Sequence, residues 1–252
     1  MTTAIRETVE AAVQGLLQTP GVRAGFDLLR SGLPSGTVPL VVGGAIRNLV
    51  IDILWGNPPV TPDIDIFIDG LSKRYDFGSL FAGQRFEVTE LGGVRWVPPA
   101  CEYAFDLCAL SSFIVLEKSG LAPSVPHLLD CLDFSVNAVI YDTAREVLHE
   151  KGCIAAVQRR EIDFNAPLYF SKLLIAYRAL LIRHKTGFHV SEPVFEFLKY
   201  QLDLDTLKDL KKAFRSKTGE PMAKAVMEDY DTICSFKNHH EYLDALGRSG
   251  SC

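Results

Sequence analysis

The stretch that decides the fold is residues 40–69, which read LVVGGAIRNLVIDILWGNPPVTPDIDIFID. It predicts a strand over 38–42, a pair of glycines, and a helix over 45–54 whose apolar residues repeat at helical spacing. A loop rich in proline and glycine ends that helix, and a second strand follows over 64–68. This order places the start of the helix beside an acidic strand.

Asp63 and Asp65 lie two positions apart at the start of the second strand. Side chains two apart on a strand point to the same face, so we expect both carboxylates to project into the same space. Mg²⁺ prefers hard oxygen ligands and usually takes one or two protein carboxylates, which leaves room for substrate phosphates. Two such ions about 4 Å apart can bind the attacking and the leaving oxygen of a phosphoryl transfer. The pair therefore predicts a Mg²⁺ (or Mn²⁺) site, and the simpler interpretation is two solvated acids at a strand end.

Gly43 and Gly44 come directly after one strand and directly before a helix. Glycines at such a position let a phosphate approach the backbone, and the N–H groups of the helix start attract it. Arg47 lies one turn into the helix and can add a charge-assisted hydrogen bond. The motif lacks the lysine of a P-loop and the third glycine of a dinucleotide site. The simpler interpretation is a tight turn with Arg47 on the surface.

The composition sets limits on the function. The chain has 252 residues, 48% of them hydrophobic, which is enough for one large domain or two small ones. The net charge of −5 argues against a constitutive non-specific nucleic-acid binder, because such proteins lean on positive charge. The six cysteines form no Cys-x-x-Cys pair and predict reduced thiols. No run approaches the roughly 18 apolar residues of a spanning helix, so we expect a soluble, cytoplasmic protein.

The remaining sequence predicts a mixed front and a helical back. We expect the α+β class: a small mixed or antiparallel sheet flanked by helices, followed by an all-helical domain, with domains at 1–165 and 166–252. Residues 4–31 predict two helices broken at 19–21, and helical spacing resumes after 168. The further expected strands are 86–91 and 93–97, joined at Gly92-Gly93, then 103–110, and a hairpin of 139–141 with 147–149.

Three segments together resemble a known family. Val-Gly-Gly-Ala-Ile-Arg at 42–47, Gly-Asn-Pro-Pro at 56–59 and Asp-Ile-Asp at 63–65 resemble the head domain of the class II poly(A) polymerase and CCA-adding tRNA nucleotidyltransferase family. Asp-Phe-Ser-Val-Asn-Ala at 133–138 and the segment from Tyr177 to Phe188 are similar to later motifs of that family, in the right order. The resemblance implies template-independent, metal-dependent transfer of a nucleotide from an NTP to an acceptor hydroxyl, above all an RNA 3′ end.

The resemblance also implies roles for individual residues. Asp63 and Asp65 would bind the catalytic Mg²⁺, and Asp106, on the strand 103–110, would be a third catalytic carboxylate or else a solvent-facing acid. The implied nucleotide contacts are Gly43, Gly44, Arg47, Asp133, Asn137 and Arg178. The alternatives for the last three are an N-cap, a local turn bond and a surface arginine whose head reaches into water.

The chain departs from the family pattern at four places, one of which is Pro-Val-Thr-Pro at 59–62, where the family has a Lys before the acid pair. Asn48 stands where the family has Asp, and Cys131-Leu132 stand where it has two arginines. Residues 171–175 lack the family's Glu-Asp-x-x-Arg motif, which reads the incoming base. Catalytic acids without a base reader imply nucleotide transfer without CCA-type base selection. Two alternatives stay open: transfer to a protein hydroxyl, and an inactive nucleotide-binding module of the same fold.

Basic residues gather in the helical back. In an acidic protein such a stretch could hold an RNA backbone, and the alternative is a solvated helix face. Its members are Lys199, Lys208, Lys211, Lys212, Arg215 and Lys217.

Overall fold

The computed structural model describes residues 2–60, 62–81, 83–89, 93–166 and 171–249. The chain divides into two compact units. The first comprises Met1–Leu132 and Val136–Val157, and the second comprises Asp133–Ser135 and Gln158–Cys252. The functional domains expected at 1–165 and 166–252 stay a prediction.

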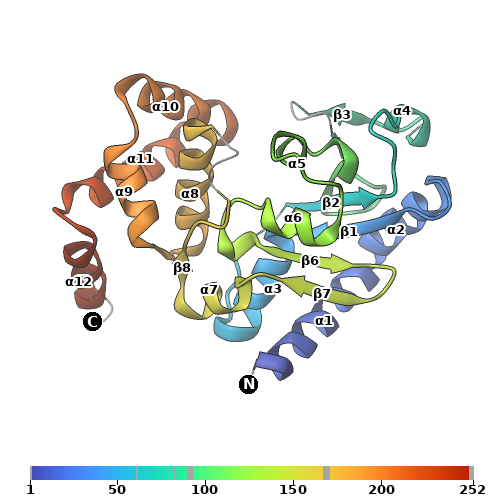
Figure 1. The fold of residues 1–252 in the computed structure, drawn as a ribbon, viewed down its shortest axis with the longest axis horizontal. Helices are drawn as coiled ribbons and strands as arrows, with labels where there is room; N and C mark the ends of the chain where they lie inside the picture. The colour runs from blue at the N-terminus through green and yellow to red at the C-terminus, as the bar shows by residue number, and fades with distance from the viewer. Residues whose placement is uncertain (1, 61, 82, 90–92, 167–170, 250–252) are drawn as a thin grey trace. The chain divides into compact units, whose positions relative to one another are not determined.

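A seven-stranded mixed sheet forms the centre of the first unit (Figure 1). The strand order is β3-β4-β5-β2-β1-β6-β7. Within the described residues β2 and β5 run parallel, and every other neighbouring pair runs antiparallel. The predicted mixed sheet is therefore confirmed. The strands are β1 (Val38–Val42), β2 (Asp63–Asp69), β3 (Phe86–Val88), β4 (Val94–Trp96), β5 (Ala104–Ala109), β6 (Val139–Asp142) and β7 (Val147–Glu150).

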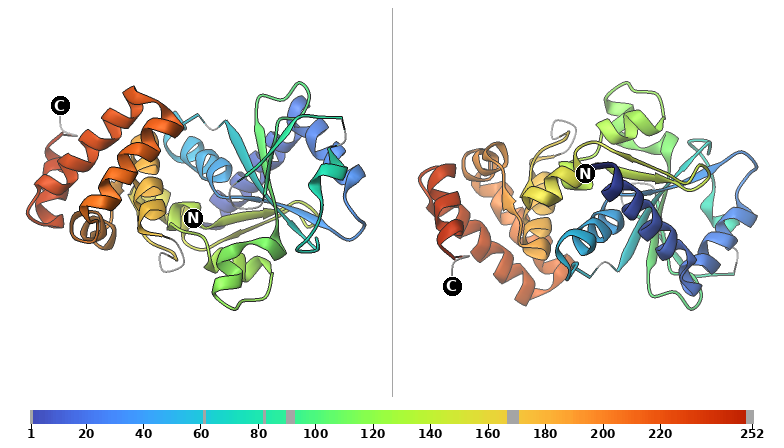
Figure 2. Two further views of the ribbon diagram at one scale, coloured as in Figure 1. Left: turned by 90° about the horizontal axis from the view of Figure 1, so that it is seen from above. Right: turned by 90° about the horizontal axis from the view of Figure 1, so that it is seen from below.

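Three long helices cover one side of this sheet, and shorter helices lie on the other (Figure 2). The long ones are α1 (Thr2–Gln18), α2 (Pro20–Gly32) and α3 (Gly44–Trp55), as the sequence predicts. On the other side lie α5 (Ile114–Lys118) and α6 (Val125–Asp130). These two, with α4 (Phe77–Leu80) and α7 (Cys153–Arg159), are too short to show helical periodicity in the sequence, and they were not predicted.

The alternation along β2 explains why the two sides of the sheet differ. Ile64, Ile66 and Ile68 have no exposed surface. Phe105 of β5 is the register partner of Ile64, and its ring lies 5.3 Å from the ring of Phe26 in α2. The even-numbered residues of β2 therefore pack toward the helices α1–α3, and the odd-numbered residues point to the opposite face.

The described residues of the second unit are mostly helical, with one short strand pair and an isolated bridge between Phe134 and Phe164. Its helices are α8 (Lys172–Thr186), α9 (Glu192–Tyr200), α10 (Leu204–Thr218), α11 (Glu220–Ser235) and α12 (His239–Ser249). The predicted end of α8 is confirmed, because Gly187 caps it in the left-handed conformation, with φ of 69°.

The strand pair corrects the expectation of a purely helical back. It joins β8 (Glu161–Ile162) and β9 (His189–Val190) in parallel, and two residues are too few to show a period of two in the sequence. Residues 90–92, which comprise the expected end of the strand 86–91 and the first glycine of its junction, lie outside the described residues, as does Tyr169, the first residue of the apolar helical face expected after 168. No described helix has the length and the apolar character that crossing a membrane requires.

Candidate active site

Three carboxylates lie side by side on the face of the sheet that α1–α3 leave uncovered. Asp65 of β2 is the register partner of Asp106 on the parallel strand β5, and Asp63 lies two residues before Asp65. Register partners on neighbouring strands point to the same face, as do residues two apart on one strand. Asp65 is exposed, and Asp63 and Asp106 are partly buried. The structure thus brings together the three acids that the sequence singles out, and their catalytic role stays a prediction.

The glycine pair lies one strand away from these acids. β1 is antiparallel to β2, and its last residue, Val42, is the register partner of Asp65. The chain that leaves β1 through Gly43 therefore continues toward the Asp63 end of β2. Gly43 has φ of 70° and ψ of −115°, a conformation that side chains disfavour, and Gly44 opens α3. The N–H groups at the start of α3 are thus available beside the acidic strand.

Arg47 is buried beneath the start of α3 and is not the surface residue of the simpler interpretation. It is 6% exposed, and its Nη1 donates to Oδ1 of Asn137 at 2.7 Å. Its Nε donates to Oδ1 of Asn48 at 3.0 Å, and Asn48 in turn donates to the carbonyl of Pro59 at 2.8 Å. A Cβ at position 44 would lie 3.6 Å from Arg47 Nη2. Arg47 and Asn137, both predicted nucleotide contacts, therefore support the glycine turn together.

Arg95 is a member of the site that the sequence analysis missed. It lies on β4 as the register partner of Asp106. Its Nη1 lies 3.2 Å from Oδ2 of Asp106, and its Nη2 lies 3.2 Å from Oδ2 of Asp63. The apolar neighbours Val94 and Trp96, both buried, indicate that Arg95 faces the other way, toward the acids. The alternation of apolar and polar residues at 94–96 indicates which way Arg95 faces, but the sequence does not show which residue of β5 lies opposite it.

The Asp106 carboxyl has a perturbed pKa. Burial raises its pKa, the Arg95 guanidinium lowers it in part, and the charge of Asp63 raises it further. In the described part of the chain, its Oδ1 is buried without a hydrogen-bond partner. A buried acceptor without a partner costs free energy that a bound ligand group can recover.

The donor set fits a divalent ion by its chemistry. Carboxylate oxygens are the ligands Mg²⁺ prefers, and Asp63 and Asp65 share a face. Over the described ranges, no cluster of three or more His, Cys, Asp or Glu side chains is close enough to hold a metal. The Arg95 guanidinium contacts both Asp63 and Asp106.

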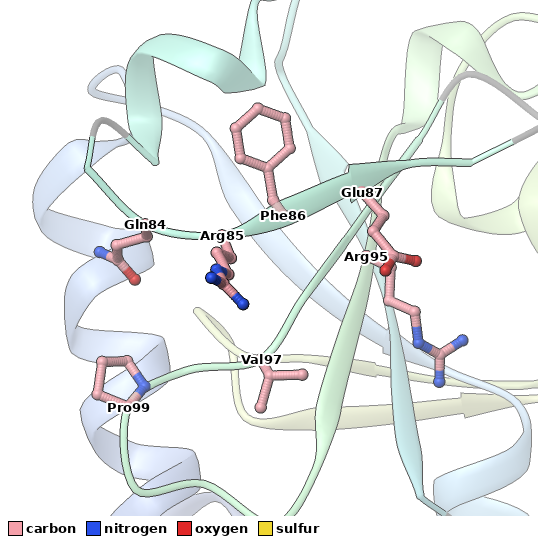
Figure 3. Close-up of a pocket in the computed structure, with 7 residues that line it drawn as sticks. All are labelled: Gln84, Arg85, Phe86, Glu87, Arg95, Val97 and Pro99. Atoms are coloured by element: carbon pink, nitrogen blue, oxygen red, sulfur yellow. The ribbon is translucent and has the colours of Figure 1, made fainter.

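One cavity lies beside Asp106, and another lies beside Arg95. The first, of about 270 Å³, is lined by the acids Asp65 and Asp106 and has an apolar wall of Phe67, Phe113 and Ile114. Burial raises the pKa of the Cys108 thiol in that wall to about 11, so it stays protonated near neutral pH. The other cavity, of about 800 Å³, is lined by Arg85, Glu87, Arg95 and their neighbours. Figure 3 shows Arg85, Arg95 and Val97 turned to one side of the β3–β4 hairpin and Phe86 to the other.

The two predicted nucleotide contacts in the second unit, Asp133 and Arg178, pair with each other. Asp133 is 2% exposed, and its carboxylate accepts hydrogen bonds from the Phe134 N–H and from Nε of Arg178. The Arg178 side chain, on α8, is 44% exposed. The pair places Asp133 inside the second unit as the partner of Arg178, and a nucleotide contact of either residue stays a prediction.

The basic stretch of the second unit is largely paired within that unit. Lys199 donates to the carbonyls of Cys234 and Phe236. Lys208 pairs with Asp205, Arg215 with Glu220, and Lys217 lies over the Tyr177 ring. Lys211 and Lys212 are exposed on α10. The RNA contact of this stretch stays a prediction, and these two lysines are its most accessible members.

No family model and no curated protein sequence matches the chain. Solved structures do match. A CCA-adding enzyme in apo form I superposes with a TM-score of 0.61 at 18% identity, over 88% of this chain and 53% of that one. A CCA-adding enzyme with ATP superposes with a TM-score of 0.57 at 19% identity, over 87% and 53%. The Thermotoga maritima CCA-adding enzyme complexed with tRNA_CCA superposes with a TM-score of 0.52 at 17% identity, over 82% and 53%.

The fold is that of the CCA-adding enzymes. The resemblance read from residues 42–65 and from the later motifs is thereby confirmed at the level of the fold, as is the α+β class. The chain spans about half the length of the CCA-adding enzymes that it matches.

Proposed function

We propose that this chain is a divalent-metal-dependent nucleotidyltransferase, which moves a nucleotide from an NTP to the 3′ hydroxyl of an RNA without a template. The observation that carries the proposal is the row of Asp63, Asp65 and Asp106 on one sheet face, one strand away from the start of α3. The fold shared with CCA-adding enzymes solved with ATP, with CTP and with tRNA supports it.

The residues in and around the acidic row have different roles in the proposed reaction. Asp63 and Asp65 would hold the divalent ion, which supplies positive charge to the reacting phosphate and lowers the cost of its developing charge. The N–H groups at Gly44 and the start of α3 bind the outer phosphates of the triphosphate, and Gly43, whose own N–H donates to the Val139 carbonyl, lets the phosphates approach the backbone. Arg47 keeps the glycine turn in shape through Asn137.

Asp106 lies on the side of the site where we expect the acceptor hydroxyl to bind. The strand order β5-β2-β1 puts it on the far side of Asp65 from the glycine pair, so it can orient the attacking hydroxyl. The acceptor hydroxyl loses its proton, which the Asp106 carboxylate can accept, and its oxygen bonds to the α-phosphorus as the bond to the bridging oxygen breaks and pyrophosphate leaves. Catalysis is then positioning and charge stabilisation.

The base preference differs from CCA addition. Ser171 accepts a hydrogen bond from the Leu174 N–H and so caps α8, at the place where the family carries its base reader. The first turn of α8 continues with Lys172, Leu173 and Leu174. The Lys172 ammonium donates to the carbonyl of Gln201, and the two leucines make no hydrogen bonds to a base edge, so we expect weak discrimination among the NTPs.

The test offers each of the four α-labelled NTPs, with Mg²⁺, to total cellular RNA and total protein. We expect label in RNA, lost in Asp63→Asn and in Asp65→Asn. Asp69→Asn is the matched control, because Asp69 lies on the same strand and face but at its far end, where it accepts from the Gly70 N–H. Label in protein would overturn RNA as the acceptor, and undiminished label in Asp63→Asn or Asp65→Asn would overturn the metal assignment.

A further inference from the structure

The Arg95 guanidinium takes a position between two of the three acids. It reaches from β4 across β5 to Asp63 on β2, with 3.2 Å contacts to Asp106 and to Asp63. The residue of β5 in register with Asp63 is Ala104, whose single methyl group leaves that diagonal open. A planar guanidinium with several donors is suited to holding two carboxylates at once. Arg95 therefore acts as a built-in cation of the acidic row.

The position of Arg95 relative to the glycine pair decides which role this cation has. The strand order β4-β5-β2-β1 places Arg95 and the glycine pair on opposite sides of Asp65. In a two-metal site one cation serves the leaving oxygen and its phosphates, and the other serves the attacking oxygen. The cation position near α3 is the one that an ion held by Asp63 and Asp65 would take. The position near Asp106, on the acceptor side, is taken by the guanidinium.

The charges of the row point in the same direction. The Arg95 guanidinium already places one positive charge between Asp63 and Asp106. A second divalent ion beside Arg95 would meet a fixed positive charge that deprotonation cannot remove, because the pKa of arginine lies above about 12. From these contacts and charges we infer that Arg95 takes the place of the second metal ion, so that the site binds a single divalent ion together with the nucleotide. This inference rests on the proposed function.

The experiment counts bound Mn²⁺ by electron paramagnetic resonance, with the folded chain and a non-hydrolysable NTP analogue. The wild type should hold a single Mn²⁺. Arg95→Gln removes the charge and releases Asp63 and Asp106, so it should gain a second. Arg95→Lys keeps the charge and should hold a single ion. Arg85→Gln is the matched control, because Arg85 lines the same cavity as Arg95 and should leave the count unchanged.

Each outcome decides between the two proposals. Two Mn²⁺ ions in the wild type, or a single ion in a folded Arg95→Gln, would overturn the role of Arg95 and leave the proposed function standing. Absence of Mn²⁺ from every variant would overturn both. The predicted counts without labelled product from any acceptor would overturn the proposed function alone. Arg95→Thr, which suits a strand, replaces the glutamine variant if that variant does not fold.

Discussion

The two faces of the seven-stranded sheet show how one strand can encode both a core and a site. On β2 the even positions Ile64, Ile66 and Ile68 are fully buried toward α1–α3, and the odd positions carry Asp63 and Asp65 on the other face. Neighbouring residues of β2 therefore have different roles, the even positions in the core and the odd positions in the site. Substitutions one position apart should separate stability from chemistry.

The largest effect is expected on the acidic face. Asp65→Asn should lower nucleotide transfer by on the order of a thousandfold, the upper range for removing one electrostatic contact to the reacting group. The carboxylate is exposed, so the free energy of unfolding should change by no more than about 0.5 kcal/mol. Single-turnover kinetics and urea unfolding measure the two quantities. A loss of stability that matches the loss of rate would contradict the separation of the faces.

The opposite result is expected one position further along. Ile66→Ala removes a fully buried side chain and should lower the free energy of unfolding by about 2–5 kcal/mol. The Mn²⁺ affinity of the protein that stays folded should not change, because Ile66 points away from the acids. Urea unfolding and a Mn²⁺ titration of the same sample check both statements. A weakened Mn²⁺ affinity would show that the two faces are coupled.

The second unit sharpens the comparison, because there an arginine neutralises a carboxylate that is buried. Arg178→Met leaves the Asp133 carboxylate without its charged partner and should destabilise the second unit by about 1–3 kcal/mol. Combined with Asp133→Asn in a double-mutant cycle, the pair should show a coupling energy of about 0.5–3 kcal/mol. If the two substitutions change the free energy of unfolding additively, the Asp133–Arg178 pair does not stabilise this unit.

The smallest effect concerns the exposed lysines of α10. Lys211→Gln with Lys212→Gln should lower the slope of log affinity for RNA against log salt by about one per lysine lost. Lys199→Met is the control, because Lys199 donates to two backbone carbonyls and should affect folding stability alone. A salt slope that is the same in all variants would exclude Lys211 and Lys212 as RNA contacts.

The sequence predicts the parts of the fold that have a clear period. β1, β2 and the β6–β7 hairpin lie where alternation and turn residues indicate them, and α3 ends at Trp55, with Gly56 as its cap. The same alternation places Asp63 and Asp65 on one face, and the strand acid Asp106 on the strand beside them. Short-range patterns suffice here because each feature is contained within a few neighbouring residues.

The sequence alone does not predict contacts between segments that are far apart in the chain. Arg95 meets Asp106 through the β4–β5 register, and a slip by one residue would turn Arg95 to the other face. Arg47 finds Asn137 across 90 positions, so its burial has no local signal. The pairing of Lys199 with two carbonyls beyond position 230 likewise depends on how α9 packs against α11.

A crystal of the chain grown with Mn²⁺ and a non-hydrolysable NTP analogue tests the central claim most directly, because manganese can be located by its anomalous scattering. The account predicts one manganese peak on the carboxylates of Asp63 and Asp65, with the triphosphate against Gly43 and Gly44. A triphosphate bound elsewhere, or manganese absent from both carboxylates while the nucleotide is bound, would contradict it.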